Sequence, residues 1–458
     1  MISLILIPIT LIIYLRLNKN YQFVIFSLAA LYPFTFGDLR SIPDFLVIEW
    51  LTLVVFVSMM NKLIIVNSLN NNFKKLKLKG IEIFNFALLI LIMWAIVSII
   101  NNEIIKQKIV IGGETGTKRA YFDIFNNVLI FFTTIIYFVI NYRDIDIQRF
   151  LKTILYISLA VGVVRGMTFY LRITTPLIGG IFTYDPISSV SEGLKAQRLL
   201  GLDYVADIGI PALFSLYVFK NRINLIALFI LLIFLFLSGG RTTMIGVTLS
   251  IVIFSILFLP KNFIYFIIVG CVLLLVAVVF LPQGFLQSKA TRLSTMEQTG
   301  FMGQDMWRGT AWYFYFKNFI IHPIFGKGIG NYTGFIYSTF PGTEDFVREQ
   351  MVSGGHGSYF SALGIFGLGG IVYLIILIFG GIILSFRKIK QNINLDHNKT
   401  AISVFCFMVL INFSILLITG FNGLTDIPFI FYCVGLICSI KVLENNPFLN
   451  QDINEDYQ

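Results

Sequence analysis

Long apolar runs separated by short polar connections dominate this chain. Many of them approach the roughly 20 residues that an α-helix needs to cross about 30 Å of hydrocarbon, whereas a water-soluble protein of this length would show amphipathic stripes. The first run is expected to be a helix and not a removed signal peptide, because no basic segment or small-residue cleavage site accompanies it. We predict thirteen spans, near residues 2–15, 21–37, 45–66, 81–100, 121–141, 150–171, 203–219, 223–238, 242–259, 263–281, 358–384, 401–420 and 425–442.

One connection, residues 282–357, is several times longer than an ordinary loop. Within it, residues 306–325 read MWRGTAWYFYFKNFIIHPIF, which is too aromatic for a flexible linker. Lys317 and His322 interrupt this stretch, so we predict a helix lying on or partly in the membrane interface. The predicted fold is an all-α polytopic membrane protein of about 12–13 transmembrane helices with a large, partly helical loop. Its expected parts are transmembrane helices with short loops (1–281), the large loop (282–357) and C-terminal transmembrane helices with a tail (358–458).

Composition and charge support a membrane protein and predict its orientation. Hydrophobic residues make up 57% of the chain and charged residues 13%, against roughly 25% charged residues in soluble domains. Of the 34 Lys and Arg residues, 18 fall on one side of the predicted spans and 9 in short loops on the other side. Because basic residues accumulate in cytoplasmic loops, we expect the large loop outside the cytoplasm and the C-terminal tail inside. The net charge of +10 is then mainly a topology signal and indicates no nucleic-acid partner.

The residue pattern gives little support to several other functions. All four cysteines fall in predicted spans, so we expect neither a disulfide framework nor a zinc site. The outer loops contain no closely spaced Asp pair that would clamp a divalent ion, and we predict no metal and no cofactor. No convincing internal repeat is present, which disfavours a secondary transporter. A flippase for lipid-linked glycans is the alternative from another functional class.

Four segments resemble the O-antigen polymerase and O-antigen ligase superfamily of bacterial membrane glycosyltransferases. They occur in the order of the family and all fall on the predicted outer side. The segments are QRLLGLDYVADIGIPALFSL from Gln197, LSGGRTTMIG around Arg241, RGTAWYFYFKNFIIHPIFGKGIGNY from Arg308, and GHGSYFSALGIFGLGG around His356.

The resemblance implies a reaction and its substrates. A member would transfer glycan from undecaprenyl diphosphate at the outer face of the inner membrane, without a metal and with inversion at the anomeric carbon. The first expectation is a polymerase that joins lipid-linked repeat units into a surface polysaccharide such as O-antigen or capsule. The alternatives are an O-antigen ligase or a protein O-oligosaccharyltransferase that uses the same donor. Donor and acceptor glycans and membrane lipids are the expected partners, with a chain-length regulator and a flippase as further candidates.

The chemistry assigns roles to a few outer residues. His356 is the candidate general base, since a neutral imidazole accepts a proton near ambient pH; the alternative is a side chain bonded to nearby backbone. Candidate diphosphate ligands are Arg241, Arg308 and Arg198, because guanidinium groups pair with phosphate oxygens. Snorkelling of Arg241 to head groups and stacking of Arg308 on a neighbouring Trp are the competing interpretations. Further candidates are Arg165 within a span, Arg292 and His322.

Overall fold

The protein is all-helical throughout the part of the chain that the structure describes, and no strand occurs there. The structure is a computed structural model. It describes residues 14–32, 51–61, 80–105, 113–170, 202–220, 222–238, 241–258, 306–326, 328, 358–419 and 427–446.

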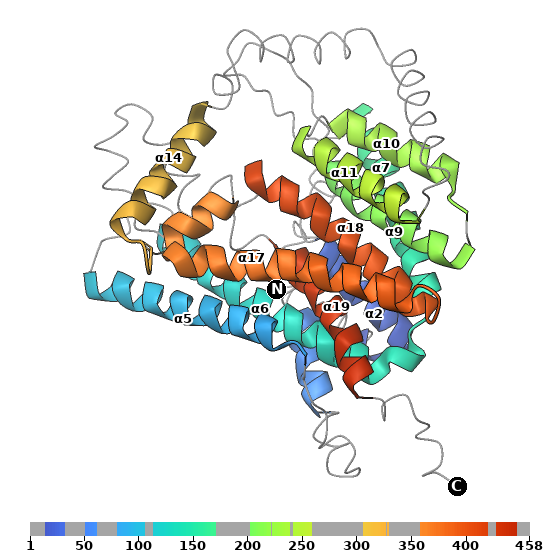
Figure 1. Cartoon of the computed structure of the whole chain (residues 1–458), viewed down its shortest axis with the longest axis horizontal. Coiled ribbons are helices and arrows are strands. Elements are labelled where there is room, and N and C mark those ends of the chain that lie inside the picture. The colour runs from blue at the N-terminus through green and yellow to red at the C-terminus, as the bar shows by residue number, and fades with distance from the viewer. Residues whose placement is uncertain are drawn as a thin grey trace, which may run out of the picture.

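The helices follow the apolar runs closely, and Figure 1 shows how they are arranged in space. They are α2 (Lys19–Leu31), α5 (Glu82–Ile105), α6 (Gly113–Asn141), the 3-10 helix η2 (Tyr142–Asp144), α7 (Ile147–Tyr170), α9 (Leu202–Lys220), α10 (Leu225–Ser238), α11 (Arg241–Phe258), α14 (Met306–Ile321), α17 (Ser358–Asn392), α18 (His397–Thr419) and α19 (Pro428–Asn445). A further apolar helix covers Leu51–Asn61.

The predicted fold class is confirmed. Eleven of the thirteen predicted spans coincide with these helices, while the span near 263–281 and nearly all of the span near 2–15 lie outside the described residues. Among the described residues, five helices are long and apolar enough to cross a membrane, so the protein is a multi-pass membrane protein. The helix predicted within residues 306–325 is also present, as α14.

The structure refines the predicted span 358–384. α17 contains 35 residues, and a straight helix of that length would extend about 53 Å, well beyond the thickness of the hydrocarbon core. Gly367 interrupts it with φ 59° and ψ −144°, a conformation that only glycine adopts readily. The segment 358–366 is therefore a separate short helix, and residues 368–392 form the long arm.

α18 occupies the centre of the bundle. It packs against α17, α11, α9, α19 and α7, and most of its side chains are buried. A helix that is apolar on all sides fits such a position. Glycines allow the neighbouring backbones to approach closely, as is common between membrane helices. A Cβ at Gly246 of α11 would lie 2.8 Å from the carbonyl oxygen of Asn412 in α18.

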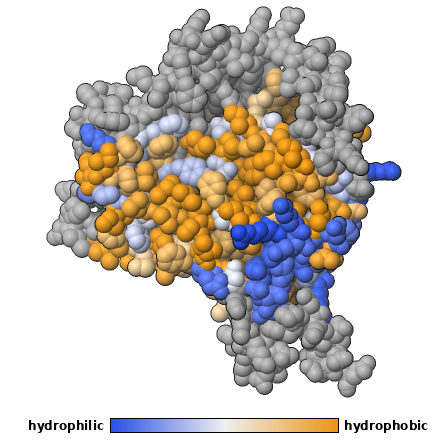
Figure 2. All heavy atoms as spheres, viewed as in Figure 1, coloured by the Kyte–Doolittle hydropathy of each residue, from blue (hydrophilic) through white to orange (hydrophobic). Residues whose placement is uncertain are grey.

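Charged side chains gather where α17 and α19 end. The ammonium of Lys388 pairs with the carboxylate of Glu444, and Asn392 Nδ2 donates to the same carboxylate at 3.2 Å. A Cβ at Gly80, just before α5, would lie 2.9 Å from Lys441 Cε. Figure 2 shows one large hydrophilic patch on an otherwise mostly apolar face, with smaller hydrophilic patches near its left and right edges. We call the region around Lys388, Asn392 and Glu444 the charged end; the charge distribution predicts that it faces the cytoplasm.

Candidate functional site

Two of the predicted diphosphate ligands begin helices. α10 ends at Ser238 and α11 begins at Arg241, as the sequence predicted, and Arg308 lies in the first turn of α14. The first turn of a helix presents unpaired backbone N–H groups and a partial positive charge. Both arginines therefore occupy backbone positions at which an anion is favoured.

α14 packs against the short first part of α17 and joins two segments that the sequence singled out separately. The rings of Trp312 and Phe360 stack with centroids 4.9 Å apart. The ring of Tyr315 is fully buried and covers Gly364, where a Cβ would lie 2.7 Å from Tyr315 Cδ1. Arg308 stands at the start of the first of these packed helices, and His356 precedes the second by two residues in the chain.

The turn after α14 enters the break in α17, and we call the contact of residues 322–326 and 328 with residues 365–370 the joint. Two backbone hydrogen bonds close it: Gly328 N to Ile365 O at 2.9 Å and Leu368 N to Pro323 O at 2.8 Å. Backbone groups that a break in a helix leaves without helical partners need other hydrogen-bond partners, and the turn supplies two of them.

The joint leaves no room for side chains at its two central glycines. Gly326 has φ 66°, and a Cβ there would lie 2.2 Å from Ile365 O. Gly367 has φ 59°, and its Cβ would lie 2.5 Å from Pro323 O. The two backbones therefore touch directly. The sequence contained these glycines, but nothing in it indicated that they meet.

Further contacts connect these helices to the rest of the bundle. The Tyr359 hydroxyl donates to Ser414 O of α18 at 3.1 Å. α18 in turn packs against α11 through the close approach of Gly246 to Asn412. A continuous series of packed helices, α14 to α17 to α18 to α11, thus links the helix that carries Arg308 to the helix that begins with Arg241.

A polar contact inside the bundle was not predicted. Pro211 lies within α9 and has no N–H to give to the carbonyl of Asp207 four residues earlier. Asn412 Nδ2 of α18 donates to that carbonyl instead, at 3.2 Å, and both residues are buried. The signal in the sequence was a proline four residues after an acidic residue within a predicted span. The donor could not be identified, because it lies about 200 residues further along the chain.

Comparison with protein families gives a match in the central part of the chain. Residues 226–375 match the O-antigen ligase family. This confirms the resemblance to the O-antigen polymerase and ligase superfamily over 150 of the 458 residues. A comparison with curated proteins found no match.

The O-antigen ligase match contains the helices of the joint and most of the predicted site. Arg241, Arg308 and His322 lie within it in described helices or turns, and Arg292 and His356 lie within it but outside the described residues. His322 directly follows α14 and is exposed. Arg165 lies in α7 and Arg198 outside the described residues, and both precede the match. The structure brings the helices of Arg241 and Arg308 into one packed series; the roles of the seven residues stay predictions.

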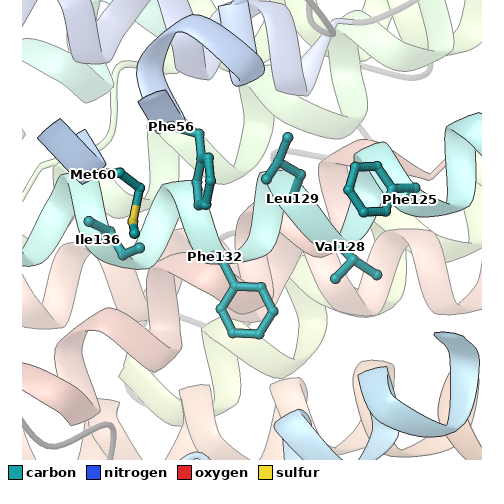
Figure 3. Close-up of a pocket in the computed structure, with 7 residues that line it drawn as sticks. All are labelled: Phe56, Met60, Phe125, Val128, Leu129, Phe132 and Ile136. Carbon is teal, nitrogen blue, oxygen red and sulfur yellow. The ribbon is translucent and has the colours of Figure 1, made fainter. Parts of the chain in front are cut away.

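An apolar groove lies between residues 51–61 and α6, outside the O-antigen ligase match (Figure 3). Its volume is about 370 Å³, and it is lined by Phe56, Met60, Phe125, Val128, Leu129, Phe132 and Ile136. None of these side chains could bind a diphosphate or activate a hydroxyl. The groove is therefore suited to hydrocarbon and not to the transfer chemistry.

Proposed function

We propose that the protein joins lipid-linked glycans on the outer side of a bacterial inner membrane. It acts as a metal-independent, inverting glycosyltransferase that uses an undecaprenyl-diphosphate-linked donor. The observation that carries the proposal is the O-antigen ligase match at residues 226–375, which contains Arg241, Arg308 and His356. The packing of α14 against the start of α17 supports a common site for Arg308 and His356.

In the proposed reaction an acceptor hydroxyl oxygen attacks the anomeric carbon of the donor glycan. The bond between that carbon and the diphosphate oxygen breaks, and the electron pair leaves with the diphosphate. His356 takes the proton of the hydroxyl, while Arg241 and Arg308 stabilise the negative charge that grows on the leaving group. Arg198 is the third proposed ligand of the diphosphate, and Arg165, Arg292 and His322 are secondary candidates.

A polymerase is the first choice, with a lipid-linked repeat unit as the acceptor. The description of the matching family supports a second candidate, an O-antigen ligase that transfers the chain to a lipid A core. The two functions differ only in the acceptor. A chain-length regulator and a flippase are the proposed partners of a polymerase.

Reconstituted protein supplied with lipid-linked repeat units would test this proposal. A polymerase would produce a ladder of longer lipid-linked glycans from the repeat unit alone. A ligase would yield no ladder and would transfer glycan only when lipid A core is present. Absence of both products, with a correctly folded protein, would contradict the proposed function.

The proposed orientation has its own test. A reporter enzyme fused within residues 282–357 should report the outer side of the membrane, and one fused within residues 385–400 should report the cytoplasm. This expectation follows from the distribution of Lys and Arg and not from the family match. The reverse pattern of reports would remove the site from the side on which lipid-linked glycans are joined.

A further inference from the structure

Trp94 of α5 touches both halves of the joint. Its indole N–H donates to the carbonyl oxygen of Ile324 at 2.9 Å, and its ring lies 5.4 Å from the ring of Phe325. On the other side it covers Gly369, where a Cβ would lie 2.4 Å from Trp94 Cε2. Trp94 lies outside residues 226–375, so no family assignment covers it.

The joint supports two helices that lead to the predicted reactive residues. From Ile321 back to Arg308, α14 extends about 20 Å, and the short helix 358–366, which follows His356 in the sequence, extends about 13 Å. The stack of Trp312 on Phe360 holds these two helices together. They therefore move as one body, and contacts with other helices decide where that body sits.

A small rotation of this body would produce a large displacement at its far end. Turning a 20 Å arm by about 5° moves its tip by about 2 Å, given the length of α14. A misplacement of about 1 Å can cost roughly 100-fold in rate when reacting groups must be aligned. Ile324 and Phe325 keep 57% and 45% of their surface exposed. Their contacts with Trp94 therefore place this residue well to hold the turn against the bundle.

We propose that Trp94 is a positioning residue of the glycan-joining site. By bracing the joint against α5, it fixes the body that carries Arg308 and leads to His356 relative to Arg241 at the start of α11. This role rests on the proposed function and acts through the joint, without contact between Trp94 and substrate. Tyr359, bonded to Ser414, braces the same body against α18.

The first test compares two substitutions that each remove one hydrogen bond to a backbone carbonyl. Trp94→Phe keeps an aromatic ring but loses the N–H that reaches Ile324. Tyr137→Phe loses a hydroxyl that donates to Lys19 O at 2.9 Å and has Gln22 Oε1 as a second acceptor at 3.2 Å, away from the joint. We expect Trp94→Phe to lower kcat about 10- to 100-fold with donor KM within about twofold of wild type. Tyr137→Phe should leave both constants within about twofold.

The second test measures position independently of the reaction. Spin labels at Phe316→Cys in α14 and Ile245→Cys in α11, both exposed positions, would report the distance between the two helices after the four native cysteines are replaced. Phe316 lies about 7.5 Å from the end of α14 at Ile321, so the same rotation of about 5° in Trp94→Phe should shift or broaden this distance by about 0.7 Å, and Tyr137→Phe should not change it. The expected result is a change in both distance and kcat.

Several results would overturn the role of Trp94. These are an unchanged distance in Trp94→Phe, an unchanged kcat despite a changed distance, and a loss expressed only in KM. A wild-type protein that joins no glycan would instead refute the proposed function, while the distance measurement would still show whether Trp94 braces the joint. The two failures are therefore distinguishable.

Discussion

The two ends of α17 are held in different ways. At its start, the short helix and the long arm meet the turn after α14 through backbone hydrogen bonds, with no side chain between the two backbones at Gly326 and Gly367. At its end, Lys388 pairs with Glu444 through long side chains that can adjust their rotamers. A contact between backbones fixes position within narrow limits, whereas a pair of flexible side chains tolerates displacement. The joint is therefore the end suited to hold reacting groups.

The surroundings explain why each end uses its own kind of contact. Charges at the charged end agree with the predicted cytoplasmic side, where water and basic residues are expected together. At the joint, the break in α17 leaves backbone groups without helical partners, and the turn after α14 supplies hydrogen bonds to them. We therefore expect substitutions at the joint end to change turnover, and substitutions at the charged end to change stability alone.

The largest effect on turnover should come from His356→Ala. If His356 only accepts the proton of the acceptor hydroxyl, its loss should lower turnover by about 10² to 10⁴ while donor binding stays nearly intact. Turnover and donor affinity of the reconstituted protein would be measured separately. Near-normal joining would exclude His356 as the base and make His322, or proton transfer to the diphosphate itself, the next candidate.

The wild-type pH profile gives an independent check on this assignment. An imidazole ordinarily has a pKa of about 6.5 and works as a base only when neutral. Turnover should therefore fall as the pH decreases through that region, and the fall should begin at a higher pH if the diphosphate raises the pKa. The profile of His356→Ala should lack this step.

The next largest effect is expected from Arg241→Ala and Arg308→Ala. Each should lower activity about 100-fold, because it removes a cation from the leaving diphosphate, while the protein still inserts in the membrane. The matched Lys variants should recover only part of the activity, since lysine keeps the charge but loses the planar fork. Full activity in either Lys variant would show that only the positive charge of that arginine is needed. Full activity in either Ala variant would exclude that arginine from the site.

How much the sequence could predict differs between these two ends. Apolar length gave the spans, and the glycines before Arg241 and the aromatic run after Arg308 correctly placed the starts of α11 and α14. Charge counting assigned Lys388 and Lys441 to the same predicted side of the membrane, because Lys and Arg act through their local position along the chain, but it did not indicate that Lys388 pairs with Glu444. The joint was not predictable in this way. It depends on Gly326 meeting Gly367, a contact between distant segments that hydropathy and local motifs do not specify.

A smaller but specific effect on folding is expected from Gly367→Ala. Alanine would have to adopt a positive φ and would place its Cβ 2.5 Å from Pro323 O, so we expect a loss of about 3 kcal/mol of stability together with a fall in turnover. Gly166→Ala in α7 is the matched control, because nothing lies within 4 Å of a Cβ there. Thermal unfolding of purified protein would compare them. Equal stability of the two variants would mean that the joint tolerates side chains.

The smallest effect on turnover should come from substitutions at the charged end. Substitutions of Lys388 and of Glu444 should lower the stability of the protein by different amounts. Lys388 is almost fully buried, with 2% of its side chain exposed, whereas Glu444 is 24% exposed and retains the bond from Asn392. Glu444→Gln leaves a buried cation without its carboxylate, with Gln391 Oε1 at 2.7 Å as a remaining acceptor, and should cost about 2 kcal/mol. Lys388→Met leaves a partly solvated carboxylate and should cost about 1 kcal/mol. Because the same interaction is lost in both, the double variant should be more stable than the sum of the two effects predicts.

Thermal unfolding would measure the stability of the two single variants and the double variant. Turnover per folded molecule should stay within about twofold of wild type in all three variants. A large fall in turnover would show that displacement at the charged end reaches the joint along the 25 residues of 368–392, so the two ends of α17 would then act as one rigid unit.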